Sequence, residues 1–172
     1  MSGHTEITVS RFIPERLGRI AQLFQRSNQF NLTTTRRTEA DCEGLMNDPA
    51  VYPIYAELRD RFGDHGLISI IVAREGEMDL SLTDWIMSCR VLVRGVEQYL
   101  MNHCAEYCAR LGKKWITGVY KPTAKNGMVK EFYQQFGFQK ISETDDGQAT
   151  WQIEAAAYHP ASVFIRAADV RA

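Results

Sequence analysis

The segment that most limits the fold of this chain is residues 67–73, LISIIVA, an almost unbroken apolar run. Such a run is typical of a β-strand that is covered on both of its faces. Apolar segments that favour strands also occupy residues 51–59 and 80–91, and a turn at residues 74–77 precedes the second of these. The three segments therefore predict an antiparallel meander at the centre of a layered domain.

The spacing of apolar residues, together with glycine and proline stops, predicts the elements around this meander. We expect helices at residues 14–27, 38–47, 95–111 and 126–136. We expect further strands at residues 7–9, 115–120, 138–142 and 149–155. This order predicts an α+β fold, with a mixed central sheet of about six or seven strands flanked by helices on both faces. Residues 1–172 are expected to form one domain, with residues 158–172 as a peripheral tail.

The composition argues against two classes of partner. Lys plus Arg number 20 and Asp plus Glu number 21, so the net charge is −1 and there is no overall basic footprint for nucleic acid. No apolar run approaches the roughly 18 residues that a transmembrane helix needs, and the first residues lack the apolar core of a secretory signal. We therefore expect a cytoplasmic protein with neither a nucleic-acid nor a membrane partner.

The cysteines are Cys42, Cys89, Cys104 and Cys108. Cys104 and Cys108 stand four residues apart beside His103, a spacing that would suit two metal ligands. They also fall on an apolar helical stripe with Leu100, which favours packing in the core. We expect no metal site, and the even number of cysteines is no evidence for disulfides here.

The second half of the chain carries a strand, a turn into a helix, another strand and a second helix. The turn contains Arg94 and Gly95, and the second helix is predicted to open at Asn126 and to end within residues 131–138, EFYQQFGF. This arrangement resembles the GNAT acyltransferase superfamily over about residues 67–155. The resemblance implies a GNAT fold and transfer of an acyl group from a thioester.

Several short strings resemble a narrower family. They are residues 19–23 (RIAQL), 28–34 (NQFNLTT), 58–67 (LRDRFGDHGL), 88–91 (SCRV) and 94–97 (RGVE). They look like the C-terminal, GNAT-like domain of FkbH-like proteins, which load glyceryl units onto acyl carrier proteins. The phosphatase-like half of those proteins, with its D-x-D-x-T motif, is absent from this sequence. The resemblance therefore implies an association with carrier-protein thioesters, but not glyceryl loading.

The turn at Arg94 bears on the identity of the donor. In the GNAT pattern R-x-x-G-x-G/A, backbone N–H groups at a helix N-terminus bind the pyrophosphate of coenzyme A. Arg94 and Gly95 are kept, but Glu97 and Tyr99 stand at the two small positions, where they add a competing charge and bulk. We infer that the donor is the phosphopantetheine thioester of a carrier protein, which has a single phosphodiester. Coenzyme A is the alternative if Glu97 is only a solvated carboxylate.

The resemblance also implies how the thioester is held. The pantetheine arm pairs like an added strand with the end of the strand at residues 80–91. A backbone N–H near Met87 or Cys89 then polarises the thioester carbonyl, while Arg94 and Gly95 hold the phosphate. Asn126 is expected to hold a pantetheine amide, although capping a helix would also explain this residue.

Tyr133 matches the family's tyrosine, which protonates the leaving thiolate. Helical spacing places Phe132 and Phe136 together on the apolar face and turns Tyr133 away from it. The alternative is an aromatic core residue. We expect Tyr133 to be the general acid.

The general base and the route of transfer stay open. Asp84 and His65 are the candidates for the base that helps an amine attack, although both could be structural. Ser88 could orient the acceptor or a water molecule. Cys89 lies beside Arg90, whose charge would lower a thiol pKa, and it could carry the acyl group in a covalent intermediate.

We therefore expect a stand-alone acyltransferase that moves an acyl group from a carrier protein to a small amine in specialised metabolism. Lys121, Lys125 and Lys130 could meet an acidic carrier protein. One alternative is an acetyl-coenzyme A N-acetyltransferase. The other is a non-catalytic module that only docks a carrier protein.

Overall fold

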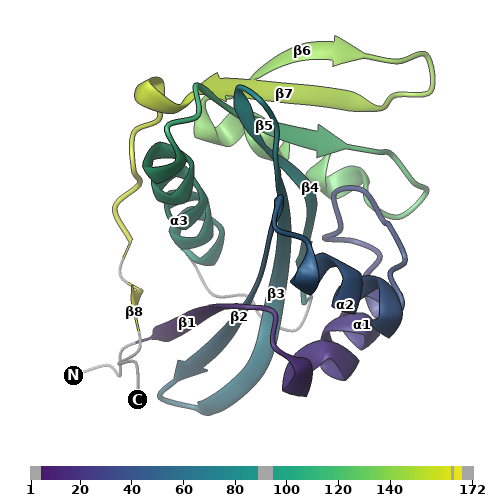
Figure 1. The fold of residues 1–172 in the computed structure, drawn as a ribbon, viewed down its shortest axis with the longest axis vertical. Helices are drawn as coiled ribbons and strands as arrows, with labels where there is room; N and C mark the ends of the chain where they lie inside the picture. The colour runs from purple at the N-terminus through teal and green to yellow at the C-terminus, as the bar shows by residue number, and fades with distance from the viewer. Residues whose placement is uncertain (1–4, 89–94, 164, 168–172) are drawn as a thin grey trace.

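The computed structural model describes residues 5–88, 95–163 and 165–167, which form a mixed sheet with helices on both faces (Figure 1). Across the sheet, the strands of this described part follow the order β6-β7-β5-β4-β3-β2-β1-β8. They are Glu6–Arg11 (β1), Val51–Asp60 (β2), Gly63–Glu75 (β3), Asp79–Met87 (β4), Trp115–Tyr120 (β5), Gln139–Glu143 (β6), Ala149–Glu154 (β7) and Arg166–Ala167 (β8). The helices are Leu17–Arg26 (α1), Glu39–Asn47 (α2) and Val96–Leu111 (α3), with 3-10 turns at Pro14–Arg16 (η1), Gly127–Val129 (η2), Phe132–Phe136 (η3) and Ala155–Ala157 (η4). The predicted α+β architecture is confirmed.

Strand β3 is covered on both faces, as its sequence predicts. All residues from Leu67 to Ala73 are buried, and β2 and β4 pair with β3 in antiparallel fashion on its two sides. Its side chains alternate between two cores: Ile70 and Val72 pack on the side of α1 and α2, whereas Ile71 packs on the side of α3. Figure 1 shows the helices on these opposite faces of the sheet.

Strands β4 and β5 are joined through α3 and pair in parallel over only part of their length. The pairing ends where Leu82 lies opposite Gly118. Directly afterwards β4 carries a bulge, because Thr83 is skipped in the pairing with β3 while Leu82 and Asp84 are both paired. The bulge and the end of the β5 pairing together open a gap between the two strands, and this gap organises the rest of the site.

The segment predicted to form one helix at residues 126–136 forms the two short turns η2 and η3 instead. Gly127 disfavours a regular helix, and a segment of this length cannot offset the cost of helix nucleation by itself. The single-helix prediction is therefore wrong. No helix in the described ranges is both long and apolar enough to cross a membrane.

The described part of the predicted tail, residues 158–163 and 165–167, packs against the rest of the domain. Tyr158 and Ile165 are buried in the core on the α3 side, and β8 pairs in parallel with β1. Asn102 of α3 anchors this segment, since its side chain accepts hydrogen bonds from the Tyr158 hydroxyl at 2.6 Å and from the Ala161 N–H at 3.0 Å. The segment packs because it supplies apolar side chains to a face of α3 that would otherwise be exposed.

Candidate functional site

The gap between β4 and β5 is filled by residues 30–32, which we call the strap. The strap comes from the loop that follows α1 and pairs with β4 as a short antiparallel segment, with Asn31 opposite Ile86. Its Leu32 N–H donates to the Trp85 carbonyl at 3.1 Å, and its Phe30 carbonyl accepts from the Met87 N–H at 3.0 Å. The β4 edge beyond the bulge is therefore already paired.

The other side of the strap is bonded to the chain that continues from β5. The Lys121 N–H donates to the Leu32 carbonyl at 2.8 Å, and the Asn126 amide donates to the Asn31 carbonyl at 2.9 Å. Asn31 and Leu32 are fully buried. The strap thus joins the two strands where they separate.

Asn126 uses its side chain to hold this arrangement together. Its amide nitrogen donates to the carbonyls of Asn31 and Lys121, both at 2.9 Å. Its amide oxygen accepts from the Thr123 N–H at 2.8 Å and from the Tyr120 hydroxyl at 3.2 Å. A primary amide offers two donors and two acceptor positions, so Asn126 has no capacity left for a pantetheine amide while the strap is in place. Its side chain also caps no helix.

Tyr133 lies at the point where β4 and β5 separate. Its ring covers Gly118 so closely that a Cβ at this glycine would be 2.5 Å from the ring. The side chain is 1% exposed, so the expectation that Tyr133 turns away from the core is wrong. The reason is that the 3-10 turn η3 directs side chains differently from an α-helix, and Tyr133 packs against both Phe132 and Phe138.

The hydroxyl of Tyr133 is buried and has no hydrogen-bond partner among the described residues. Burial raises its pKa well above the ordinary 10.0, with smaller contributions from Cys104 and Asp84. The hydroxyl therefore stays protonated and can donate a hydrogen bond to a group that enters this position. Its role as the acid stays a prediction.

Asp84, a candidate base, is held in an ion pair on the α1 side of the sheet. Its two carboxylate oxygens accept from Arg37 at 2.9 and 3.2 Å, and one of them also accepts from the Thr83 hydroxyl at 2.8 Å. Burial alone would lower the pKa of Arg37, but the hydrogen bond and charge of Asp84 outweigh it and raise that pKa. The geometry gives Asp84 a structural task, because its oxygens are already engaged by a cation.

His65, the other candidate base, lies elsewhere. It is an exposed residue near the β2–β3 hairpin end, where its Nε2 is 2.9 Å from a carboxylate oxygen of Asp60. Asp60 also accepts from the Phe62 N–H within the turn, which makes the group a local hairpin network. In the part of the chain that the structure describes, no contact brings His65 to Asp84 or to the strap.

Of the remaining predicted residues, Met87 and Ser88 lie at the end of β4 and Gly95 lies at the start of α3. Met87 is buried, and the Ser88 N–H donates to the Ile68 carbonyl at 2.8 Å, which continues the β3 pairing. Gly95 precedes α3 with φ 92°, a left-handed conformation that favours glycine, and Val163 and Ile165 lie over it. Cys89 and Arg94 lie outside the described residues, so the structure does not test their predicted roles.

The helix cysteines pack in the core, as predicted. Cys104 and Cys108 are fully buried in α3, and burial raises the pKa of the Cys104 thiol to about 12 and that of Cys108 to about 11. Both thiols therefore stay protonated. Within residues 5–88, 95–163 and 165–167, no three His, Cys, Asp or Glu side chains gather as a metal-binding group.

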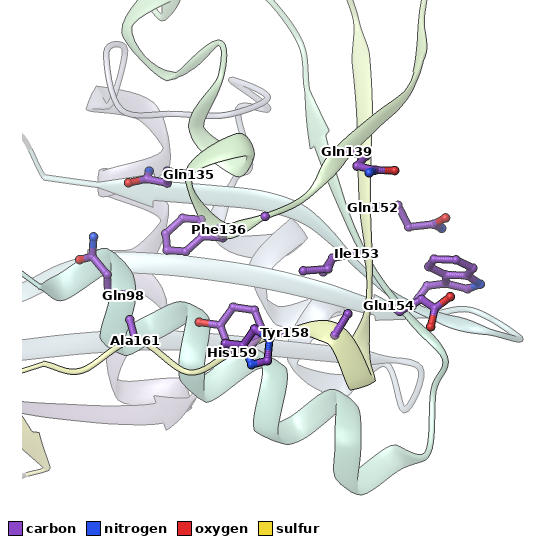
Figure 2. Close-up of a pocket in the computed structure, with 13 residues that line it drawn as sticks. Gln98, Gln135, Phe136, Gln139, Gln152, Ile153, Glu154, Tyr158, His159 and Ala161 are labelled. Carbon is purple, nitrogen blue, oxygen red and sulfur yellow. The ribbon is translucent and has the colours of Figure 1, made fainter.

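A separate cavity of about 550 Å³ lies beside α3, η3 and β7 (Figure 2). Its polar lining includes the side chains of Gln98, Gln135, Gln139, Gln152 and Glu154. The amide oxygen of Gln98 is buried there without a described partner. None of the predicted site residues lines this cavity, so the sequence predictions did not detect it.

Sequence reasoning also missed Asn31 and Arg37, which fix the strap and its neighbouring loop. The signal was present in residues 28–34, NQFNLTT, a string that the family resemblance singled out. Its polar character indicated a loop, because side chains that bond to buried backbone look the same in sequence as solvated ones.

Several solved structures have the same fold. An acetyltransferase from Thermus thermophilus is 15% identical, with 87% of this chain and 97% of that chain covered at a TM-score of 0.66. The ribosomal-protein-S18-alanine N-acetyltransferase from Escherichia coli is 13% identical, with 92% and 99% covered at a TM-score of 0.65. The spermidine N-acetyltransferase from Vibrio cholerae, in complex with CoA and spermine, is 15% identical, with 89% and 98% covered at a TM-score of 0.66.

These similarities show that the chain has the GNAT fold, as predicted. No protein-family model matches the chain, and no curated protein matches its sequence. The narrower resemblance to FkbH-like proteins gains no support from these comparisons and stays a prediction.

Proposed function

We propose that this domain transfers an acyl group from a coenzyme A thioester to an amine at the gap between β4 and β5. The observation that carries the proposal is the partnerless hydroxyl of Tyr133, buried against Gly118 where the two strands separate. A buried hydroxyl without a partner is costly, and a bound ligand is one way to supply the missing bond. The shared fold with acetyltransferases supports this assignment.

The reaction requires little from the protein beyond positioning and hydrogen bonds. The amine nitrogen attacks the thioester carbonyl carbon, so that a C–N bond forms and the C–S bond breaks. The Met87 N–H would stabilise the developing oxyanion once it is free of Phe30, and the Tyr133 hydroxyl would donate to the departing sulfur. The proton that the amine loses ends on the sulfur, which leaves as a thiol.

Coenzyme A is preferred here over a carrier-bound donor. The Vibrio cholerae enzyme of the same fold was solved in complex with CoA and spermine, which favours a CoA thioester as donor and an amine as acceptor. A carrier protein presents the same thiol end on its phosphopantetheine arm, so it remains the second donor to test. The weakened pattern at Glu97 and Tyr99 is the argument for that second donor.

A second candidate function is binding without catalysis. The strap is bonded on both sides, and Asn126 is saturated by the strap and its own loop. In this arrangement the residues at the gap do not fit a pantetheine arm. A GNAT-fold module that docks a carrier protein through its surface would need no open gap.

The protein should be incubated with acetyl-CoA and with spermine, spermidine or a peptide that begins with alanine, while thiol release is followed. We expect release that depends on the amine, and Tyr133→Phe should slow it by roughly 100-fold. Tyr158→Phe is the matched control, because its buried hydroxyl bonds Asn102 away from the gap and its loss should leave the rate unchanged.

Equal rates in wild type and Tyr133→Phe would remove Tyr133 from the mechanism. No thiol release with either acetyl-CoA or an acyl-loaded carrier protein, together with a thermal shift on adding the carrier protein, would establish the docking function instead.

A further inference from the structure

The strap uses the edge of β4 that an added strand would use. Its Phe30 carbonyl accepts a hydrogen bond from the Met87 N–H, the group expected to polarise a thioester carbonyl. Its Leu32 N–H donates to the Trp85 carbonyl. An incoming arm that augments β4 needs these same partners. We infer that residues 30–32 are an internal occupant of the donor site and that an acyl thioester binds only after the strap leaves. This inference rests on the proposed function.

The segment that must move, residues 28–35, is followed by two anchored arginines. Arg36 donates to the carbonyls of Phe24 and Ser27 at the end of α1, at 2.6 and 2.8 Å. The neighbouring Arg37 is tied to β4 by its ion pair with Asp84. Release of the strap can therefore leave α1 and α2 in place, because these contacts lie outside residues 28–35.

Asn31 is the residue that closes the strap locally. Its amide nitrogen donates to the Ser27 carbonyl at 3.2 Å, and its amide oxygen accepts from the Thr34 N–H at 2.8 Å. These two bonds fold residues 27–34 into the shape that fits the gap. Neither bond involves Met87 or Tyr133, so Asn31 can be changed without touching the groups that would meet the donor.

The backbone is strained at Thr34, two residues after the strap. Thr34 has φ 51°, in the left-handed region that β-branched residues rarely adopt. Such strain persists only when surrounding contacts enforce it, and here Thr34 donates to Asn31 from its N–H at 2.8 Å and from its hydroxyl at 3.5 Å. Leaving the gap would relieve this strain, which brings the strapped and released states closer in free energy.

Two substitutions should change donor binding in opposite directions. Asn31→Ala removes both local bonds, favours the released state and should tighten acetyl-CoA binding by about tenfold, since apparent affinity scales with the open fraction. Thr34→Asn places a residue that tolerates the left-handed region, favours the strapped state and should weaken binding about threefold. Gln25→Ala is the control, because its side chain bonds the Arg37 carbonyl, outside residues 28–35.

Hydrogen exchange of the wild-type protein supplies a readout that does not depend on turnover. Adding acetyl-CoA should speed exchange in a peptide that covers residues 28–35, because the Leu32 N–H loses its partner. Exchange in a peptide that covers residues 85–88 should stay slow, since the donor replaces the strap there. Circular dichroism and thermal unfolding of each variant show whether it is folded before its binding is compared.

The outcomes separate this inference from the proposed function. Turnover with a strap that stays protected, and with equal affinities in all variants, would overturn the strap inference and leave acyl transfer standing. Tighter binding by Asn31→Ala without turnover would support the strap inference and defeat the proposed catalysis. No binding of acetyl-CoA by any folded variant would defeat both, and the strap would then be a permanent strand of the sheet.

Discussion

The two halves of β4 pair the same strand edge with different partners. From Asp79 to Leu82 the neighbour is β5, a full strand delivered by the α3 crossover. Beyond the bulge at Thr83 the neighbour is the three-residue strap, which arrives from the loop after α1. Both halves are paired, but only the second has a partner that could leave without dismantling the sheet. Under the proposed function, the half of β4 beyond the bulge is therefore the one that would meet the donor.

The largest effect should come from Gly118→Ala, which disturbs the first half. A methyl group here would meet the Tyr133 ring at 2.5 Å, and neither backbone nor buried ring can yield easily. We expect a loss of about 3 kcal/mol in the free energy of unfolding, measured with urea. Gly127→Ala is the control, since nothing lies within 4 Å of its added Cβ and it should change little. Similar curves for both variants would contradict the close packing.

Asn126→Ala tests the second half of β4 and should destabilise the fold somewhat less than Gly118→Ala does. It leaves the buried Asn31 carbonyl short of its side-chain donor and loosens the Thr123 turn. We expect about 2 kcal/mol of destabilisation, with the strap's amide exchange rising more than that of β3. If exchange rises equally in both segments, the strap is no less tightly held than the sheet and the comparison fails.

Tyr133→Phe should change the stability of the fold in the opposite direction. Tyr133 packs where the two halves of β4 meet. Removing a buried hydroxyl without a partner is expected to stabilise the fold by about 1 kcal/mol, even as the same change slows acyl transfer. Thermal unfolding of the unliganded protein measures this. A loss of stability instead would mean that the hydroxyl has a partner, and the case for a ligand at this position would weaken.

The smallest effect concerns acid pH and lies away from both halves. His103 shares a hydrogen bond with the Tyr52 hydroxyl at 2.8 Å, and burial lowers its pKa below the ordinary 6.5, although Glu106 raises it and Arg110 lowers it. The unfolded chain therefore binds the proton more readily. Stability should be full above about 6.5 and decline as the pH falls toward the folded pKa.

Urea unfolding of wild type and His103→Gln at several pH values measures this decline. The variant should lose the dependence on pH between neutral and mildly acidic conditions. A variant with the same pH dependence as wild type would assign the effect to other groups.

The predictions from sequence succeeded where one residue type has one physical consequence. The apolar run of β3 had to be covered on both faces, and the stripe that contains Cys104 and Cys108 had to face a core. The helix predicted at residues 38–47 forms as α2, and Thr38 opens it with a capping box to Asp41. In these cases the partner is either local or simply any apolar surface.

The predictions from sequence were incomplete where the partner is distant and polar. The amide of Asn126 was expected to face a donor, but it bonds Asn31, which lies 95 residues away in the chain. The carboxylate of Asp84, one of two candidate bases, is engaged by Arg37. A sequence shows that such groups need partners without showing which partners they meet.

The sequence by itself determined most of the order of strands and helices, the two-sided burial of β3 and the strand–helix–strand crossover, because hydrophobic periodicity is read locally. Only the tertiary structure decided what enters the gap between β4 and β5. Backbone N–H and C=O groups are the same in every residue, so no pattern of side chains could tell whether Met87 would meet a thioester or Phe30.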